Sequence, residues 1–268
     1  MANAVKPPCH VSGTAFITGA ASGIGKSIAH IFAQNGISGL ALADISAPAL
    51  SSSLHELSTA YPHIRIETFT MDVTKEEDIA AAVKATSERF GRIDISIHGA
   101  GIAGTHTATH DFSLQDWRKT IDVNQTGVML CDKWVVGQML GQELKPGYEG
   151  RGIIVNIASM FGVTTPPGWL GGVAYSAAKH AVVAITKIDA KTYAREGIRI
   201  NAICPGYVDT PLINTGLESG VLSPEVEKTA LKRPANPEEI ADAVLFLTSR
   251  MGSYMCAGSL VVDGGYTA

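Results

Sequence analysis

The sequence predicts an α/β fold formed by a single domain over residues 1–268, in which a doubly wound parallel sheet of about seven strands carries helices on both faces. Two observations lead to this fold class. Short apolar runs alternate along the chain with segments of helical spacing, which is typical of repeated strand–helix–strand units. The 268 residues, 46 % of them hydrophobic, can bury one large core, and no repeat or linker divides them.

The first predicted strand, Thr14–Thr18, leads through a glycine-rich turn into a helix. The turn reads Gly19-Ala-Ala-Ser22-Gly23-Ile24-Gly25, and helical spacing continues from Lys26 to Gln34. Such a turn lets the backbone approach a pyrophosphate closely, and the free N–H groups of the helix start favour its negative charge. The order Gly-x-x-x-Gly-x-Gly differs from the commoner Gly-x-Gly-x-x-Gly. The turn alone therefore indicates a Rossmann-like site without identifying its ligand.

The second predicted strand, Gly39–Asp44, ends in a carboxylate. Asp44 comes nineteen residues after Gly25, close to the offset of roughly 20 residues at which an acid binds the ribose hydroxyls of a dinucleotide. A carboxylate there repels the 2′-phosphate of NADP, and neither Ser22 nor the pair Ile45-Ser46 supplies a neutralising cation. The sequence therefore favours NAD as the cofactor.

The remaining elements follow from the same alternation. Residues 1–12 form a lead-in to the first strand. Residues 205–234 contain several prolines and glycines with weak periodicity, which predicts a mobile flap over the cofactor. Further strands are predicted at Ile64–Met71, Ile93–His98, Gly152–Ile157, Arg199–Ile203 and Ser259–Val262, and further helices at Lys75–Phe90, Ser113–Leu140, Val173–Tyr193 and Pro237–Leu247.

A tyrosine and a lysine share one helical face in the run Tyr175-Ser-Ala-Ala-Lys179, sixteen residues after Ser159. Free tyrosine, with a pKa of about 10, is a poor base at neutral pH, but a neighbouring cation favours the phenolate. We therefore predict that Lys179 lowers the pKa of Tyr175 and makes it a general acid/base. Such a pair alone is weak evidence, because it is common on surface helices.

In their order, these motifs resemble the short-chain dehydrogenase/reductase family from about Gly13 to Gly265. The resemblance implies a catalytic tetrad and a set of cofactor contacts. In it, Asn124 holds a water that links Lys179 to solvent, and Thr210 bonds the carboxamide. The matching residues are the Thr18–Gly25 turn, the adenine-flanking pair Asp72 and Val73, the small residues Gly99 and Ala100, the tetrad Asn124, Ser159, Tyr175 and Lys179, the nicotinamide-side loop Cys204–Thr210 with Pro205, Gly206 and Val208, and the C-terminal Asp263-Gly264-Gly265.

The chain departs from the family pattern at His98. It reads His98-Gly99-Ala100-Gly101 where the family usually has Asn-Asn-Ala-Gly, so the small residues are kept and an asparagine is replaced. A packed, hydrogen-bonded histidine is the favoured interpretation, and a substrate contact is the alternative.

A second departure is the segment Thr164–Val173, which makes the interval between Ser159 and Tyr175 longer than is usual in the family. Both ends of the segment are tied to predicted catalytic residues. We therefore hypothesise that Trp169 lines the substrate pocket and favours a bulky or ring-containing substrate. An interface between subunits is the competing position for this side chain.

The function that the resemblance implies is hydride transfer between a small-molecule secondary alcohol or ketone and the nicotinamide of NAD. Ser159 binds the substrate oxygen and Tyr175 exchanges its proton. Two alternatives use the same scaffold: non-redox chemistry such as dehydration or isomerisation, and a pseudoenzyme that only binds the dinucleotide. The intact tetrad favours the redox enzyme, while the fold does not select a substrate.

Composition argues against several other classes. The net charge of −4, without a block of like charges, gives no footprint for nucleic acid or an anionic membrane. His106 and His110 have i,i+4 spacing, but no glutamate follows His106, so no metal site is predicted. No signal core or apolar stretch of about 18 residues is seen, and a cytoplasmic enzyme is expected. Free thiols are expected at the scattered cysteines Cys9, Cys131, Cys204 and Cys256.

The helix predicted at Val173–Tyr193 is apolar on nearly all its sides. A helix that lies on a sheet is expected to be polar on its outer face, so the excess apolar surface requires a partner. We predict a homo-oligomer, a dimer or a tetramer, and the family resemblance places this helix and the one containing Asn124 in a two-fold interface. The apolar positions are Ala177, Ala178, Ala181, Val182, Val183, Ala184 and Ile185.

Overall fold

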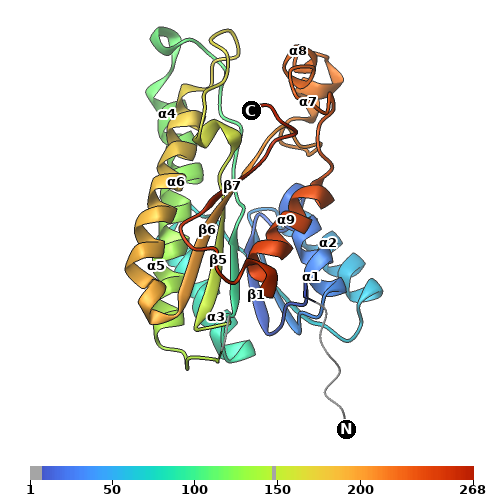
Figure 1. The fold of residues 1–268 in the computed structure, drawn as a ribbon, viewed down its shortest axis with the longest axis vertical. Coiled ribbons are helices and arrows are strands. Elements are labelled where there is room, and N and C mark those ends of the chain that lie inside the picture. Colours follow the sequence, from blue (N-terminus) through green and yellow to red (C-terminus); the bar gives the residue numbers. More distant parts are fainter. Residues whose placement is uncertain (1–7, 147–148) are drawn as a thin grey trace.

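The computed structural model describes residues 8–146 and 149–268, which form the predicted α/β fold (Figure 1). Seven parallel strands lie in the order β3-β2-β1-β4-β5-β6-β7. The chain therefore runs outward from β1 to one edge, returns beside β1, and then runs to the other edge. The strands are β1 Thr14–Thr18, β2 Gly39–Asp44, β3 Arg65–Thr70, β4 Ile95–His98, β5 Gly152–Ile157, β6 Ile198–Pro205 and β7 Ser259–Val262.

Helices cover both faces of the sheet. In Figure 1, α1, α2 and α9 lie on one side and α4, α5 and α6 on the other, and α3 packs against α5. Among the described residues no helix is both long enough and apolar enough to cross a membrane. The helices are α1 Gly23–Gln34, α2 Ala47–Ala60, α3 Glu76–Phe90, α4 Leu114–Ile121, α5 Gly127–Leu140, α6 Val173–Tyr193, α7 Asn214–Glu218, α8 Ser223–Val226 and α9 Pro237–Thr248.

The central strand β1 shows why its sequence has no polar face. Successive side chains of a strand point to opposite faces. Ile17 packs in the cluster that includes residues of α1 and α9, whereas Phe16 packs in the cluster that includes residues of α3 and α5. Both faces are covered, so both sets of side chains are apolar.

The structure adds to the predicted elements or divides them at three places. Helix α2 was not predicted. The single helix predicted at Ser113–Leu140 is α4 and α5 joined by a π-helical turn, Asp122–Thr126, which admits one extra residue per turn. The predicted flap, residues 205–234, contains two short helices, α7 and α8.

The fold places the carboxyl ends of all parallel strands at one edge. Thr18, at the end of β1, pairs with Ala43 of β2 on one side and His98 of β4 on the other. The chain changes direction in the sheet between β1 and β4. Ligands of open α/β sheets bind outside the strand ends at such a switch point.

Candidate active site

A cavity of about 830 Å³ opens at this edge of the sheet. Its walls come from the segments that follow β1, β2, β3, β4, β5 and β6, from α6 and from the flap. Every site residue predicted from the sequence lies in the lining: Gly19, Ser22, Gly23, Ile24, Gly25, Asp44, Ile45, Asp72, Val73, Gly99, Ala100, Asn124, Ser159, Tyr175, Lys179, Pro205, Gly206, Val208 and Thr210.

The glycine turn is packed too closely for side chains. Gly19 has φ +69°, and a Cβ on it would lie 2.8 Å from the amide nitrogen of Ala100. A Cβ on Gly25 would lie 2.1 Å from the carbonyl oxygen of Gly19. The start of α1 therefore reaches the cavity as bare backbone, which suits the pyrophosphate of a dinucleotide. Thr18 fastens the facing loop, because its hydroxyl accepts hydrogen bonds from the N–H groups of Gly99 and Ala100.

Asp44 lies at the end of β2 with both carboxylate oxygens held by backbone. Oδ2 accepts from the N–H of Ala21 at 3.1 Å, and Oδ1 accepts from the N–H of Ser46 at 3.0 Å. These bonds fix the negative charge beside the glycine turn. The exposed side chain of Ile45 follows it in the cavity wall. This end of the cavity therefore fits the adenosine half of the cofactor.

Asp72 and Val73 extend the same end of the cavity beyond β3. Asp72 Oδ1 accepts hydrogen bonds from the backbone N–H and the hydroxyl of Thr74, at 3.0 and 2.8 Å. Val73 packs closely on Gly127: a Cβ built on Gly127 would lie 3.0 Å from the Cβ of Val73. The β3 segment is thus held against the start of α5.

At the other end of the cavity, Ser159 follows β5 and Tyr175 lies in the first turn of α6. Ser159 is buried, and its Oγ accepts a hydrogen bond from the N–H of Phe161 at 3.1 Å. Burial raises the pKa of Tyr175, and a hydrogen bond from Ser159 opposes that rise only in part. The prediction that Lys179 lowers this pKa is therefore wrong in this structure, where desolvation dominates.

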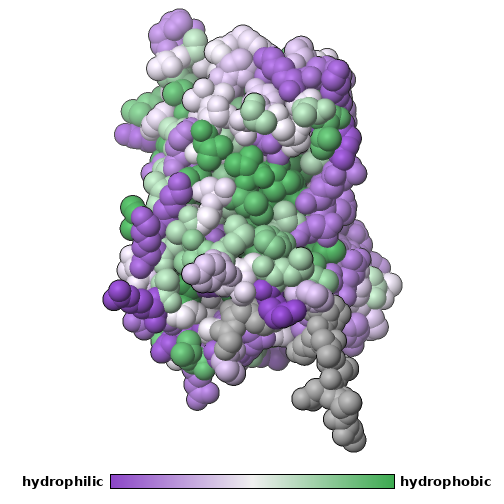
Figure 2. All heavy atoms as spheres, viewed as in Figure 1, coloured by the Kyte–Doolittle hydropathy of each residue, from purple (hydrophilic) through white to green (hydrophobic). Residues whose placement is uncertain are grey.

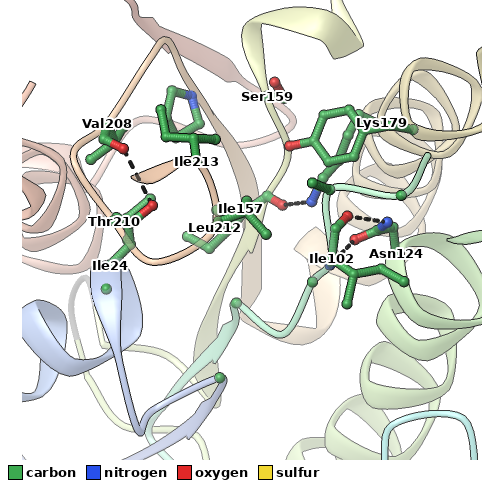
Figure 3. A pocket seen from close by; sticks show the side chains of 18 of the residues that line it. Ile24, Ile102, Asn124, Ile157, Ser159, Lys179, Val208, Thr210, Leu212 and Ile213 are labelled. Carbon is green, nitrogen blue, oxygen red and sulfur yellow. Dashed lines mark hydrogen bonds between the residues drawn. The ribbon is translucent and has the colours of Figure 1, made fainter. Parts of the chain in front are cut away.

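Lys179 is buried one helical turn beyond Tyr175. Its ammonium nitrogen lies 5.6 Å from the centre of the tyrosine ring and donates to the carbonyl of Ile157 at 2.8 Å (Figure 3). Burial lowers the pKa of Lys179 to about 8. The ammonium thus lies beneath the phenol ring and is bonded to β5 instead of to the phenol oxygen.

Asn124 lies in the π-helical turn and is buried. Its Oδ1 accepts from the N–H of Ile102 at 3.0 Å, and its Nδ2 donates to the carbonyl of Ile102 at 2.9 Å, as Figure 3 shows. A Cβ on Gly101 would lie 2.8 Å from the same Oδ1 and 3.9 Å from Lys179 Nζ. Asn124 therefore braces the loop after β4 directly beside the lysine.

The nicotinamide-side loop is tied to the C-terminal signature. The N–H of Gly206 donates to the carbonyl of Val262 at 2.9 Å, and a Cβ on Gly206 would lie 2.7 Å from Asp263 Cα. Thr210 turns its hydroxyl back to the carbonyl of Val208 at 3.2 Å (Figure 3). This contact positions Thr210 in the cavity wall, where its methyl group would lie 3.2 Å from a Cβ built on Gly23.

The flap is attached to the C-terminal tail through a buried carboxylate. Glu225 of α8 accepts hydrogen bonds from the hydroxyl of Tyr266 at 2.6 Å and from Lys228 Nζ at 2.7 Å. Burial opposes ionisation of this carboxyl, but hydrogen bonds from Lys228, Tyr266 and Trp169 hold its pKa below the usual value. The charged form therefore stabilises the attachment, and this contribution is lost as the pH falls through the lowered pKa.

The hypothesis that Trp169 lines the substrate pocket is wrong in this structure. The side chain is 57 % exposed and is absent from the described lining of the cavity. Its hydrogen bond to Glu225 holds it on the flap side of the loop. Leu170 takes the inner position, together with Pro166. The alternative, a subunit interface, stays a prediction.

His98 is a packed, hydrogen-bonded histidine, which confirms the favoured interpretation. It is 1 % exposed and does not reach the cavity. Its Nδ1 lies 2.9 Å from Asn156 Oδ1 and its Nε2 lies 2.8 Å from the hydroxyl of Ser96. His98 thus bonds β4 to β5 beneath the catalytic end of the cavity.

Sequence analysis missed several residues that shape the substrate end. Ile102 anchors Asn124 only through its backbone, which no residue type could have indicated. His106 lines the cavity, although it was considered only as a metal ligand. The apolar side chains of the flap gave a detectable signal, because they interrupt a segment otherwise rich in turn residues. They are Leu212, Ile213, Val221 and Leu222.

Comparison with known proteins finds relatives over nearly the whole chain. A family model described as Enoyl-(Acyl carrier protein) reductase matches residues 19–267. The short-chain dehydrogenase srdC of Neurospora crassa is 38 % identical in an alignment that covers 96 % of this chain and 97 % of the relative. The cis-4-hydroxycyclohexanecarboxylate dehydrogenase of Sinomonas cyclohexanicum is 36 % identical over 254 residues, which cover 95 % and 96 %.

Structural similarity extends over the same length. The crystal structure of levodione reductase has a TM-score of 0.88 and 34 % identity to this chain, with coverage of 96 % of this chain and 98 % of that one. The glycine turn, the acid after β2 and the Ser159, Tyr175 and Lys179 set lie around one cavity in this fold. The chain belongs to the short-chain dehydrogenase/reductase family.

Proposed function

We propose that the protein is an NAD-dependent oxidoreductase that transfers a hydride between a secondary alcohol or ketone and the nicotinamide. One observation carries this proposal: Ser159, Tyr175, Lys179 and Asn124 gather at one end of a cavity whose other end is a glycine turn with an acid beside it. Non-redox chemistry or a binding-only role does not require all four groups, and no observation favours either.

In oxidation, Ser159 donates a hydrogen bond to the substrate oxygen, and Tyr175 as phenolate takes the hydroxyl proton. In reduction, Tyr175 donates that proton to the carbonyl oxygen. When bound, NAD supplies the hydride acceptor. The Lys179 ammonium lies 5.6 Å from the centre of the phenol ring, and burial rather than this cation sets the direction in which the pKa of Tyr175 is shifted. The water link through Asn124 stays a prediction.

We further propose a ring-containing substrate. The substrate end of the cavity is lined by apolar side chains, including Met160, Phe161, Leu170 and Leu222, and such a surface suits a compact hydrocarbon ring. The name of one relative also denotes a substituted cyclohexane alcohol. The test is NADH absorbance with NAD and a panel of cyclic and open-chain secondary alcohols. Absence of NADH formation with every alcohol, and of NADH consumption with the corresponding ketones, would contradict the proposal.

The charge of Asp44 sets a prediction about cofactor choice. We expect wild type to have a kcat/KM for NAD at least about tenfold above that for NADP, which corresponds to about 1.4 kcal/mol. Asp44→Asn removes the charge and keeps an acceptor for one backbone N–H, so it should erode the preference, as should Asp44→Ala. Glu88→Gln removes an exposed carboxylate of α3 outside the lining and serves as the control. Equal or better kinetics of wild type with NADP would refute the assignment.

We propose that the protein is a homotetramer with two kinds of interface. The exposed positions of α6 include the apolar residues Val173, Ala177, Ala184 and Ile188 beside His180, Lys187, Lys191 and Thr192, and Trp134 and Leu140 of the neighbouring α5 are also exposed. A second apolar area lies around β7 at the sheet edge, where Val261 is exposed, and Figure 2 shows hydrophobic residues gathered on this face. Two separate self-complementary patches generate a dimer of dimers.

The cytoplasmic location expected from the sequence likewise stays a prediction.

Ile188 tests the α6 interface. It is 64 % exposed on α6, so Ile188→Glu places a charge in the proposed apolar contact and should reduce the native mass measured by light scattering. Lys84→Glu, on the exposed surface of α3, should leave the mass unchanged. A monomeric wild type at micromolar concentration would contradict the proposal.

A further inference from the structure

His106 lies where the substrate end of the cavity meets two loops. The residue belongs to the loop between β4 and α4 and is part of the cavity lining. Its Nδ1 lies 3.1 Å from the carbonyl oxygen of Leu170, in the loop that precedes α6. His110, four residues later, is instead on the surface and pairs with Asp111 at 3.3 Å. The two histidines therefore have different surroundings.

The contact with Leu170 fixes the proton of the ring. A carbonyl oxygen only accepts, so Nδ1 carries the hydrogen, and Nε2 of the neutral ring is an acceptor. No described residue is within hydrogen-bond distance of that Nε2. The ring is exposed, so this acceptor can reach a ligand in the cavity without breaking an existing bond.

The backbone places His106 beside the start of α6. Gly172 has φ +89°, and a Cβ built on it would lie 3.8 Å from His106 Nδ1. Gly172 precedes α6 directly, and Tyr175 follows three residues later, which is a rise of about 4.5 Å along a helix. His106 thus lies beside the start of α6, the helix whose first turn carries Tyr175.

The surroundings of His106 make it distinctive. Most other side chains of this end are apolar or belong to the catalytic set. Polar exceptions in the described lining include Thr215, Ser176 and Tyr207, and the hydroxyls of the last two are buried without a partner among the described residues. An apolar pocket orients its ligand through a small number of placed polar groups. His106 offers such a group beside the start of α6, the helix that carries Tyr175.

We propose that His106 is a specificity-determining residue whose Nε2 accepts a hydrogen bond from a second hydroxyl group of a cyclic secondary alcohol. The substrate class is therefore a cyclic diol or a hydroxyketone of the same ring. This inference rests on the proposed oxidoreductase function and names the substrate class of the same site.

The test compares two substrates that differ only in the second hydroxyl: cyclohexanol and cyclohexane-1,4-diol. The readout is the ratio of kcat/KM for the diol, per reactive hydroxyl, to that for cyclohexanol. His106→Asn keeps a donor near the Nδ1 position and loses the Nε2 acceptor. We expect wild type to favour the diol and His106→Asn to lower the ratio about tenfold, as for one hydrogen bond.

Two further variants separate recognition from loop support. His106→Gln reaches the Nε2 position without the Leu170 contact and should retain part of the preference, while His110→Asn should leave the ratio at the wild-type value. A purely structural role would lower both rates and leave the ratio unchanged in every variant, which would overturn the inference. Oxidation of neither compound by wild type would instead refute the proposed function for ring alcohols, and the inference with it.

Discussion

Replacing Tyr175 by phenylalanine should lower kcat by about 10² or more, the scale of a lost general acid/base. The substitution removes one hydroxyl from a buried ring and leaves the packing of α6 intact. In the proposed function the cofactor is held mainly by the glycine turn, the β2 acid and the loops after β4 and β6, so its binding should persist. NADH fluorescence titration measures that binding, and steady-state oxidation measures the turnover.

The pH dependence gives this prediction a second readout. Burial raises the pKa of Tyr175, so the phenolate is the minor form at neutral pH and its population grows as the pH rises. Oxidation by wild type should therefore accelerate through the alkaline range, and the residual activity of Tyr175→Phe should lose that dependence. Ser159→Ala is the matched comparison, because it removes a hydroxyl beside the same oxygen and keeps the titrating group. Retained turnover in Tyr175→Phe would mean that the proton goes elsewhere.

The fold and the cavity could be predicted because their requirements are local in the chain. Because the turn approaches Ala100 closely, only glycine fits at position 19, and the sequence shows this as a characteristic spacing of glycines. The i,i+4 arrangement of Tyr175 and Lys179 likewise needs only a helix. Asp44 follows a strand at a fixed distance from the turn. These groups therefore lie in one lining, while their catalytic and binding roles stay predictions.

What could not be predicted depends on contacts between distant segments. The π-helical turn at Asn124 accompanies two bonds to the backbone of Ile102, and no side-chain pattern records them. The raised pKa of Tyr175 depends on burial by the folded chain rather than on its lysine neighbour. Helix α2 did leave signals, a Ser46 cap and buried Leu50 and Leu57, but its run of serines has weak helical propensity and obscured them.

Replacing His98, which departs from the family pattern, by a small side chain should cause a large loss of stability. Both hydrogens of the Asn156 amide are used, one on Asp132 Oδ2 and one on the hydroxyl of Thr186, each at 3.0 Å. Asn156 Oδ1 is therefore an acceptor, and Nδ1 of His98 must carry the hydrogen that it receives. Asp132 Oδ1 lies 3.0 Å from the same nitrogen.

This network joins β4 and β5 to the two long helices α5 and α6, and it is sealed from water. Asp132 is 1 % exposed, and its charge is felt nearby, since burial and then Asp132 raise the pKa of Asp189. A buried carboxylate is tolerated only with partners that compensate its lost hydration. Asn156 Nδ2 supplies a hydrogen bond on the Oδ2 side, whereas Oδ1 accepts no hydrogen bond from a described residue and has His98 Nδ1 as its polar neighbour.

We expect His98→Ala to lower the free energy of unfolding by about 3–5 kcal/mol, because it leaves a cavity, removes the partner of Asn156 Oδ1 and of the Ser96 hydroxyl, and takes away the ring nitrogen 3.0 Å from the buried Asp132 Oδ1. His98→Asn, the usual family residue, can donate to one of those acceptors and should cost less. Denaturant unfolding at a fixed protein concentration measures both, since oligomer stability depends on concentration.

A double-mutant cycle shows whether the cost belongs to the pair with Asp132. In an Asp132→Asn background the buried charge is absent, so His98→Ala should be milder by about 2 kcal/mol, within the range found for residues in contact. Additive losses would mean that His98 acts only by filling space between β4 and α5. In that case His98→Leu, which has a similar volume, would be as stable as wild type. A coupled loss, with His98→Leu as unstable as His98→Ala, would show that the histidine is kept for its hydrogen.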